Sequence, residues 1–330
     1  MHFLTFLLTL GFALSGVQSI PAPSQPFPEV DRASNPLNAA RALPSGDLYP
    51  PQPPGAGPGK RGLLYNTESN VEWSNFYVES PYVTYGSNGD VIRGDEINAW
   101  FSYVPTITVD AKLENSDWND TVPILIEGGT KAMFASNEPD NPSQANLTPA
   151  QCVTVYKRFM QPYYGTVQLG TPAVTNGGGQ AGLTYLDDFV RLCTGCAYNF
   201  VNVHFFVDRS EMSVTQYIEA LTTYIDVTVP AIQAKHAPLV GLPIAVGEVG
   251  IPSLKISPRS HHRLTSSQFW LTGASEAEAG ALMDELLPWL DGNANVLFYQ
   301  ACGGLFEGGF VDAAGTGLTP AGTAYGGLAL

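Results

Sequence analysis

Basic residues are scarce in this chain. It has 15 Lys and Arg against 30 Asp and Glu, and its formal net charge at pH 7 is -15. A surface of this sign repels the phosphates of nucleic acid, which excludes nucleic acid as a partner. The same acidity suits a soluble enzyme that works in an acidic medium.

Long apolar runs are absent after the first 20 residues, so no segment is predicted to span a membrane. The apolar block at residues 3–14 is too short for a bilayer, and Val17-Gln18-Ser19 fits a signal-peptidase site. The residues before this block include no Lys or Arg, which is unusual for a signal. We predict that residues 1–19 are a signal peptide and that the protein is secreted, to the extracellular space or the cell wall.

The usual motifs of cofactor and metal sites are also missing. No Gly-rich nucleotide loop follows the first predicted strand, where Asn66-Thr67-Glu68 stands instead. The five histidines are scattered, and no pair of them shares helical ligand spacing with an acid. A single C-x-x-C, Cys193-Thr194-Gly195-Cys196, has no second copy to complete a zinc site. We therefore expect neither a cofactor nor a metal.

Cysteines and glycosylation sequons agree with secretion. The four cysteines are an even number, which suggests disulfides in an oxidising compartment and leaves three pairings open. They are Cys152, Cys193, Cys196 and Cys302. At the C-x-x-C we favour a structural bridge over thiol chemistry. Asn119-Asp120-Thr121 and Asn146-Leu147-Thr148 are acceptable N-glycosylation sequons.

Proline is concentrated in one segment, residues 20–60, where a packed core is nearly impossible. We predict a disordered Pro-rich segment or propeptide there, without chemistry of its own. Lys60-Arg61 at its end is either a dibasic processing site or simply the start of the first strand, and the two are compatible. The remaining residues, 61–330, suit one large catalytic domain better than two small ones.

Short apolar runs alternate with amphipathic stretches through that domain. The predicted strands cover residues 62–66, 82–85, 103–109, 131–137, 167–174, 199–206, 242–248 and 296–301. The predicted helices cover residues 148–163, 183–192, 214–235 and 275–290, with Thr148 capping the first and Ser275 and Glu278 forming a capping box on the last. This alternation predicts a single-domain α/β fold of the (β/α)8 TIM-barrel type, with an open doubly wound sheet as the alternative.

Two glutamates follow buried strands directly. The apolar run at residues 132–135 ends in Asn137-Glu138-Pro139-Asp140, and residues 243–247 run straight into Glu248. The active site of a barrel lies at the carboxyl ends of its strands, so both carboxylates are expected at that end of the barrel. A lone glutamate at such a place is more often a solvated loop residue. Two of them supply the acid and the nucleophile that a retaining glycosidase needs.

Several motifs, taken in order, resemble glycoside hydrolase family 128, the fungal alkali-sensitive-linkage-type β-1,3-glucanases. The motifs are Lys60-Arg61-Gly62-Leu63-Leu64-Tyr65-Asn66, Ser136-Asn137-Glu138-Pro139-Asp140, Gly170-Thr171-Pro172-Ala173-Val174-Thr175-Asn176, and Cys193-Thr194-Gly195-Cys196 followed by Val203-His204. The resemblance covers most of residues 60–306. It implies a barrel with catalytic glutamates on strands four and seven, acting on a β-glucan polysaccharide or oligosaccharide.

The resemblance also implies residue roles. Glu138 would be the acid/base, Glu248 the nucleophile, and Asn137 would hold the sugar 2-hydroxyl. His204 would lie beside Glu248, with a core histidine as the alternative, and Tyr65, Asn66 and Asn176 would line the cleft. For retention we expect carboxyl groups about 5 Å apart. We also expect burial and neighbouring groups to raise the pKa of Glu138 so that it starts protonated.

The chain departs from the family around the sugar subsites. Phe205-Phe206 stands where the family tends to show Trp or Tyr, and Gly247 and Val249 flank Glu248 atypically. Residues 300–304 have no aromatic, and residues 251–273, which include His261, His262 and Trp270, look like an insertion. Trp73 and Trp270 are candidates for sugar stacking. We expect a monomeric enzyme; the alternatives are a non-catalytic β-glucan or cell-wall-binding protein on the same barrel, and an adhesin.

Overall fold

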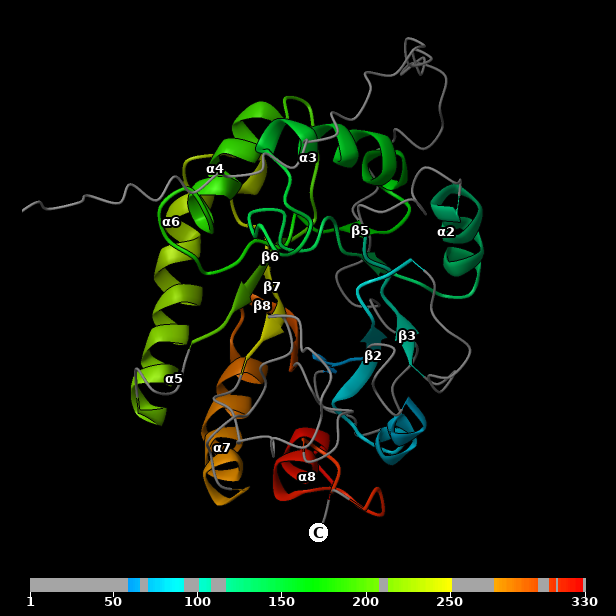
Figure 1. The fold of residues 1–330 in the computed structure, drawn as a ribbon, viewed down its shortest axis with the longest axis vertical. Coiled ribbons are helices and arrows are strands. Elements are labelled where there is room, and N and C mark those ends of the chain that lie inside the picture. Colours follow the sequence, from blue (N-terminus) through cyan, green and yellow to red (C-terminus); the bar gives the residue numbers. More distant parts are fainter. Residues whose placement is uncertain are drawn as a thin grey trace, which may run out of the picture. The chain divides into compact units, whose positions relative to one another are not determined.

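The computed structural model describes eight stretches of the chain, drawn as ribbon in Figure 1. They are residues 59–65, 71–91, 101–107, 117–207, 213–250, 276–301, 309–312 and 314–328. All of them belong to one compact unit, residues 40–330. The predicted signal peptide, most of the Pro-rich segment, Asn66, Ser275, Cys302 and the insertion at 251–273 lie outside the described residues. Predictions about those parts stay predictions.

Parallel strands form the centre of this unit. One sheet has six strands in the order β3-β2-β1-β8-β7-β6, and a second pairs β4 with β5. All the strand pairs are parallel, which confirms the predicted α/β class. The strands are β1 (Arg61–Leu64), β2 (Val83–Ser87), β3 (Ser102–Tyr103), β4 (Ala132–Met133), β5 (Gln168–Leu169), β6 (Val201–Phe205), β7 (Ile244–Val249) and β8 (Val296–Ala301).

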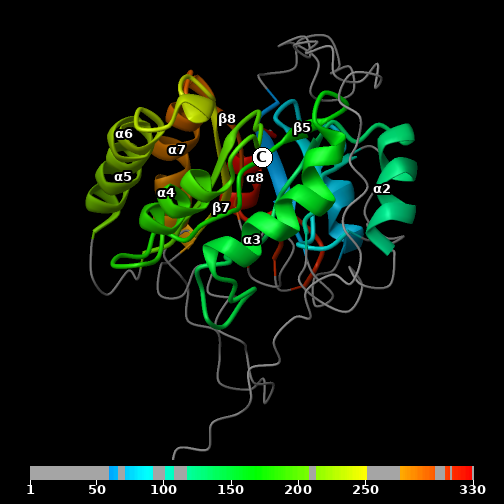
Figure 2. The same cartoon turned by 90° about the horizontal axis from the view of Figure 1, so that it is seen from above.

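The helices lie on the outer side of the strands (Figures 1 and 2). The α-helices are α2 (Asp117–Glu127), α3 (Pro149–Val155), α4 (Leu183–Leu192), α5 (Val214–Thr223), α6 (Val229–Gln233), α7 (Glu276–Gly292) and α8 (Pro320–Gly326). Shorter turns are η2 (Val71–Tyr77), η3 (Tyr156–Met160), η4 (Gln161–Tyr163), η6 (Tyr224–Thr228) and η7 (Ala237–Leu239). The sequence analysis did not predict η2, α2 or α8.

Local sequence explains where two helices begin and which face they bury. Thr148 caps α3 as predicted, because its hydroxyl accepts the Gln151 N–H while the Gln151 side chain accepts the Thr148 N–H. In α4 the buried side chains recur at helical spacing and form one apolar face. They are Tyr185, Leu186, Phe189 and Val190. The helices predicted at residues 148–163 and 214–235 are each interrupted by a π-helical turn, η3 in the first and η6 in the second.

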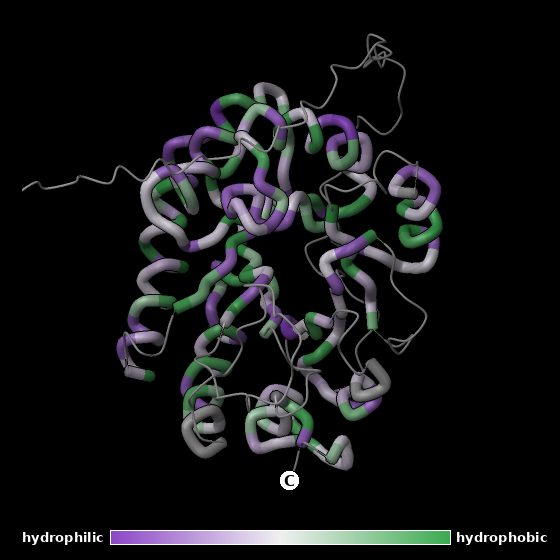
Figure 3. Tube along the Cα trace, viewed as in Figure 1, coloured by the Kyte–Doolittle hydropathy of each residue, from purple (hydrophilic) through white to green (hydrophobic). Residues whose placement is uncertain are grey.

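Four aromatic rings fill the space enclosed by the strands. This aromatic cluster consists of Tyr85, Phe134, Phe200 and Phe298, whose neighbouring ring centroids lie 5.1 to 6.2 Å apart. Glycines make room for two of the rings, because a Cβ on Gly62 would lie 2.1 Å from Tyr85. Figure 3 shows the strands as mostly hydrophobic and the outer helices as mixed. The cluster is a packed floor beneath the carboxyl ends of the strands.

Arg61 is the first residue of β1 and is only 4% exposed. Its guanidinium pairs with Asp291 of α7, and it donates hydrogen bonds to the carbonyl oxygens of Ala324 and Tyr325 at 2.9 and 2.6 Å. The Tyr299 hydroxyl donates to the same Asp291 carboxylate at 2.8 Å. Arg61 therefore links β1 to α7 and α8. Processing after Arg61 stays a prediction, and it would remove this buried cation from the domain.

Asp291→Asn is expected to lower the free energy of unfolding by about 3 kcal/mol. The amide keeps the shape of the side chain but leaves the buried Arg61 charge uncompensated, which is far costlier than losing a surface pair. Urea denaturation measures the loss. Asp188→Asn is the control, because the Arg191–Asp188 pair is 61% and 37% exposed and is expected to contribute little to stability. Equal losses in both variants would contradict the role given to Arg61.

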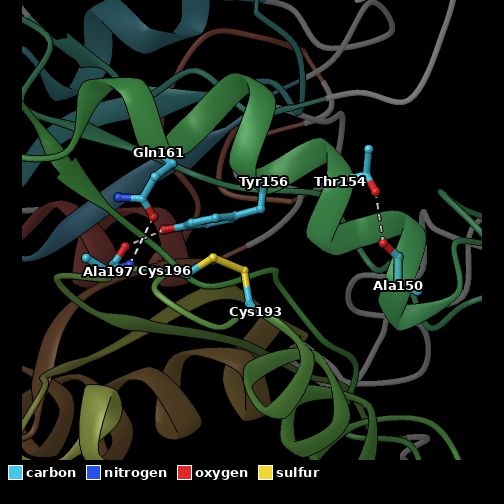
Figure 4. The surroundings of a disulfide bond; sticks show 7 residues. All are labelled: Ala150, Thr154, Tyr156, Gln161, Cys193, Cys196 and Ala197. Atoms are coloured by element: carbon cyan, nitrogen blue, oxygen red, sulfur yellow. Dashed lines mark hydrogen bonds between the residues drawn. A yellow bond between two sulfur atoms is a disulfide. The ribbon is translucent and has the colours of Figure 1, made fainter. Parts of the chain in front are cut away.

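The C-x-x-C forms a disulfide between Cys193 and Cys196, next to η3 and η4 (Figure 4). Ala197 follows it and is held from both sides: its carbonyl accepts the Tyr156 hydroxyl at 2.9 Å, and its N–H donates to Gln161 at 3.0 Å. Cys152 is a free and buried thiol, and burial raises its pKa to about 12. These features confirm a structural bridge at the C-x-x-C.

Candidate active site

Glu138 follows β4 in an unusual backbone conformation. Its φ is +37°, in the left-handed region that residues other than glycine rarely adopt. A hydrogen bond of 2.8 Å from its N–H to the Ala173 carbonyl holds it there, beside the bridge that pairs Asn137 with Ala173. The residue is 7% exposed. The strained turn therefore aims a nearly buried carboxylate inward from the end of the strand.

Glu248 is placed by a bulge in β7. The register pairs Val203 with Val246 and then His204 with Glu248, so Gly247 is the extra residue. A β-bulge turns the side chain that follows it, and bulges are common beside active sites. Gly247 has no room for a side chain, since a Cβ there would lie 2.4 Å from Asn202 Oδ1. Glu248 keeps 16% of its side chain exposed.

His204 joins the two carboxylates. Its Nδ1 lies 3.0 Å from Glu138 Oε1 and 3.8 Å from Glu248 Oε2, and the residue is 2% exposed. One carboxylate oxygen of Glu138 lies within 4.8 Å of one of Glu248. The structure thus brings three of the residues singled out in the sequence to one point. His204 was expected beside Glu248, but its hydrogen bond is to Glu138.

The pKa of Glu138 is lowered, whereas the sequence analysis expected it to be raised. Burial raises it, but the hydrogen bond and charge of His204 and the Asn141 amide, 2.7 Å from Oε2, outweigh burial. For His204, burial lowers the pKa, and the charge of Glu248, the hydrogen bond and charge of Glu138, and the charge of Asp140 more than reverse this. Glu138 and His204 thus form a buried carboxylate–imidazolium pair that shares one proton.

His204→Asn should reduce stability most between about pH 4.5 and 6.5. Because the pKa of Glu138 is lowered, Glu138 contributes its full stabilisation of the folded state above its ordinary pKa of 4.5. This stabilisation is lost as the pH falls through the pKa that Glu138 has in the folded protein. Because the pKa of His204 is raised, His204 contributes its full stabilisation of the folded state below its ordinary pKa of 6.5. This stabilisation is lost as the pH rises through the pKa that His204 has in the folded protein. Thermal and urea unfolding across pH should show a loss of about 2 kcal/mol in that window.

Glu138→Gln is the matched control for this pH dependence. The ion pair needs both partners, so this variant should lose the same pH-dependent part of the stability as His204→Asn. A stability difference that is the same at pH 3, 5.5 and 9 in both variants would show that the pair is not ionised in the folded protein.

The other predicted binding residues lie in different settings. Asn137 lines the same cavity as His204 and Glu248. Tyr65 is 4% exposed and packs in the hydrophobic core just after β1. Both amide atoms of Asn176 are engaged with the Phe206 backbone, at 2.8 and 3.1 Å, so this side chain ties two loops together. An amide has a second N–H and a second oxygen lone pair, so contact with a sugar does not require breaking either bond.

Asp140 and Asn141 support the site, although the sequence analysis gave neither a role. The Asp140 carboxylate accepts the Thr175 N–H and hydroxyl, the latter at 2.6 Å, and the Gly182 N–H at 2.7 Å. It thereby fixes the Glu138 loop to the loop after β5. Their position just after Glu138, in a turn rich in Asn and Asp, was the available signal.

Trp118 belongs to the core. It is fully buried, and its indole N–H donates to the Phe159 carbonyl at 2.9 Å. Trp289 packs against the hydrophobic core. The side chain of Trp73 and the whole of Trp270 lie outside the described residues. Sugar stacking therefore stays a prediction for those two.

Glu138, His204 and Glu248 are also the one group among the described residues with the composition of a metal site. However, Nδ1 of His204 is already hydrogen-bonded to Glu138, so a metal would have to displace that bond. The arrangement suits proton transfer between an imidazole and a carboxylate.

In the described part of the chain no helix is long and apolar enough to cross a membrane.

Paired glutamates at the ends of parallel strands define a class of glycosidase, and the comparison with known families agrees. The family described as glycosyl hydrolase catalytic core matches residues 62–325, and the chain belongs to it. Solved structures of glycoside hydrolase family 128 are similar to the chain, and one that is 28% identical confirms the resemblance seen in the motifs. No curated protein sequence matches the chain significantly.

Three of these structures illustrate the likeness. One is a curdlan-specific exo-β-1,3-glucanase of subgroup III from Blastomyces gilchristii, solved in complex with glucose. It is 28% identical to this chain with a TM-score of 0.63, and the alignment covers 82% of this chain and 98% of that one. An endo-β-1,3-glucanase from Sorangium cellulosum is 19% identical (TM-score 0.59; 82% and 98% covered). One from Amycolatopsis mediterranei, in complex with laminaritriose, is 20% identical (TM-score 0.57; 82% and 99%). The latter two show the fold alone.

Proposed function

We propose that this glycoside hydrolase cleaves β-1,3-glucan with retention of the anomeric configuration. The observation that carries the proposal is the approach of the Glu138 and Glu248 carboxylates, whose oxygens come within 4.8 Å. Retaining enzymes hold their carboxyl groups about 5 Å apart, so that one can attack the sugar directly. Inverting enzymes need roughly 6.5 to 9.5 Å, which leaves room for a water molecule.

We also propose that the strands close into a (β/α)8 barrel. Single parallel bridges join the edges of the two sheets: Thr106 pairs with Phe134 on one side, and Gly170 pairs with Phe200 on the other. With the sheet orders, these bridges make every strand a neighbour of the next and β8 a neighbour of β1. In such a barrel Glu138 and Glu248 stand at the same, carboxyl-terminal mouth.

In the first half of the reaction, a Glu248 oxygen attacks the anomeric carbon while Glu138 protonates the departing glycosidic oxygen. This breaks the glycosidic bond and leaves a covalent glycosyl–Glu248 ester. Glu138, now ionised, then takes a proton from water as the water attacks the same carbon and releases the sugar. The proton for the first half is available across the 3.0 Å bond from His204 Nδ1 to Glu138 Oε1. Asn137, which lines the same cavity as Glu248, would bind the sugar 2-hydroxyl.

The substrate follows from a solved relative. The protein from Blastomyces gilchristii, 28% identical to this chain, is a curdlan-specific exo-β-1,3-glucanase and was solved with glucose. The aromatic-poor stretch at residues 300–304 leaves this chain fewer stacking surfaces at strand eight. We propose that the enzyme is secreted and monomeric; N-terminal sequencing of protein from culture medium and its mass in solution test these two points.

Proton NMR of the reaction tests the function. The purified protein is incubated near pH 5 with laminarin, curdlan, cellulose and a mixed-linkage glucan. Sugars released from β-1,3-glucan should appear first as the β-anomer and only later mutarotate. First appearance of the α-anomer would show inversion. Binding to β-1,3-glucan with no release from any substrate would mean that the protein is a non-catalytic glucan-binding member of the family.

A further inference from the structure

Two buried amide side chains line the same cavity as Glu248 and Phe134 of the aromatic cluster. Asn202 stands on β6 two residues before His204 and is fully buried, and Gln300 stands on β8 opposite Gly62 and is 2% exposed. Among the described residues, neither polar atom of the Asn202 amide has a hydrogen-bond partner, nor does Gln300 Oε1. Leaving a buried polar group unsatisfied costs about 1–3 kcal/mol, so these groups need a ligand.

Both amides line one small cavity. It has a volume of about 10 Å³, and Glu248, His204 and Phe134 also border it. This is about the space that one water molecule occupies by the same measure. The hydroxyls of Ser87 and Thr106 border the cavity too, but they lie 3.3 Å apart and hydrogen-bond to each other. Among the side chains that line the cavity, Asn202 and Gln300 therefore carry the fully buried atoms that have no hydrogen-bond partner in the described structure.

We propose that Asn202 and Gln300 bind one ordered water molecule, which donates a hydrogen bond to Glu248. Such a water satisfies two of the three unmet atoms, Asn202 Nδ2 and Gln300 Oε1, and leaves Asn202 Oδ1 against Gly247. It accepts from the Asn202 NH₂ group and donates one hydrogen to Gln300 Oε1. Its second hydrogen is left for the Glu248 carboxylate on the wall of the same cavity. Asn202 and Gln300 are then positioning residues that act on Glu248 through the water.

Gly247 connects this water site to the bulge that places Glu248. A Cβ at Gly247 would lie 2.4 Å from Asn202 Oδ1 and 3.1 Å from Nδ2, so the glycine lets the amide approach β7. Any larger residue would push the Asn202 amide off the cavity. Gly247 thus has two roles: it forms the bulge that orients Glu248, and it leaves room for the Asn202 amide that binds the water.

The water matters because it favours the ionised form of Glu248. A hydrogen bond donated to a carboxylate lowers its pKa, and the attacking residue must be ionised. Removing the donor should raise the pH of the acidic limb of kcat and slow the chemical step. This effect rests on the proposed function of Glu248, whereas the water site itself does not.

A high-resolution crystal structure of the wild-type protein is the first test. It should show one water within hydrogen-bonding distance of Asn202, Gln300 and Glu248. The Asn202→Val variant, in which a side chain suited to a strand replaces the amide, should lack that water. Its kcat should fall about tenfold with KM unchanged, which is the effect expected from losing one hydrogen bond. The acidic limb of its pH profile should move to higher pH. Gly247→Ala should shift the limb the same way.

Val203→Ala is the control, because it weakens the same strand at a buried position without touching the amide. It should lower Tm but leave the acidic limb in place. Wild-type density without a water at this site overturns the proposal, and so does an unmoved limb in both Asn202→Val and Gly247→Ala. Clear water density in a protein that releases sugar from no glucan would instead overturn the proposed function and leave the water site standing.

Discussion

Glu248→Gln should lower kcat on β-1,3-glucan by about 10⁴-fold or more, with little change in the affinity for the glucan. The amide has nearly the same size as the carboxylate, so the bulge and the packing around His204 are kept. It carries no negative charge and is a very poor nucleophile, so the glycosyl–enzyme ester cannot form. Initial rates on laminarin and equilibrium binding to the same substrate measure the two quantities separately.

Glu127→Gln is the matched control for that loss, because Glu127 is an exposed carboxylate at the end of α2. Its activity should stay at the wild-type level. A smaller variant, Glu248→Ala, opens space for azide, which should restore turnover by attacking in place of the carboxylate and yield an α-glycosyl azide. A Glu248→Gln protein within tenfold of wild-type activity would mean that another group attacks the sugar.

The sequence predicted the positions of Glu138 and Glu248 at the carboxyl ends of strands well, because both positions depend on local rules. A buried strand appears in the sequence as an apolar run. A charged residue directly at the end of such a run indicates a functional role. The same local signals gave the bounds of α4 and β8 and the Thr148 cap on α3. Helix propensity also led to continuous helices at residues 148–163 and 214–235, where the structure has π-helical turns that no residue type announces.

The electrostatics could not be read from the sequence, because they arise between residues far apart in the chain. His204 lies 66 positions after Glu138, and their 3.0 Å contact decides the direction of the Glu138 pKa. From sequence alone only burial was visible, and burial alone would have raised that pKa. The bonds between the Asn176 amide and the Phe206 backbone were likewise not visible, because they depend on how two loops meet.

Glu138→Ala should lower kcat/KM on laminarin by about 10³-fold, which is typical of losing a general acid. The loss should be far smaller on an aryl β-glucoside with an acidic phenol as leaving group, because that group departs without a proton. The alkaline limb of the pH profile should also disappear on the aryl substrate, since it reports the proton that Glu138 shares with His204. Rates on both substrates between pH 4 and 9 measure these effects.

The two substrates separate the role of Glu138 from a structural one. Loss of its hydrogen bonds to His204 and Asn141 could loosen the site, but a loosened site would slow both substrates alike. Azide should restore turnover of the aryl glucoside and yield a β-glycosyl azide, the opposite anomer to that from Glu248→Ala, because it then attacks the glycosyl ester. Equal losses on both substrates, with no azide product, would remove Glu138 as the acid and leave its carboxylate only the task of holding the His204 proton.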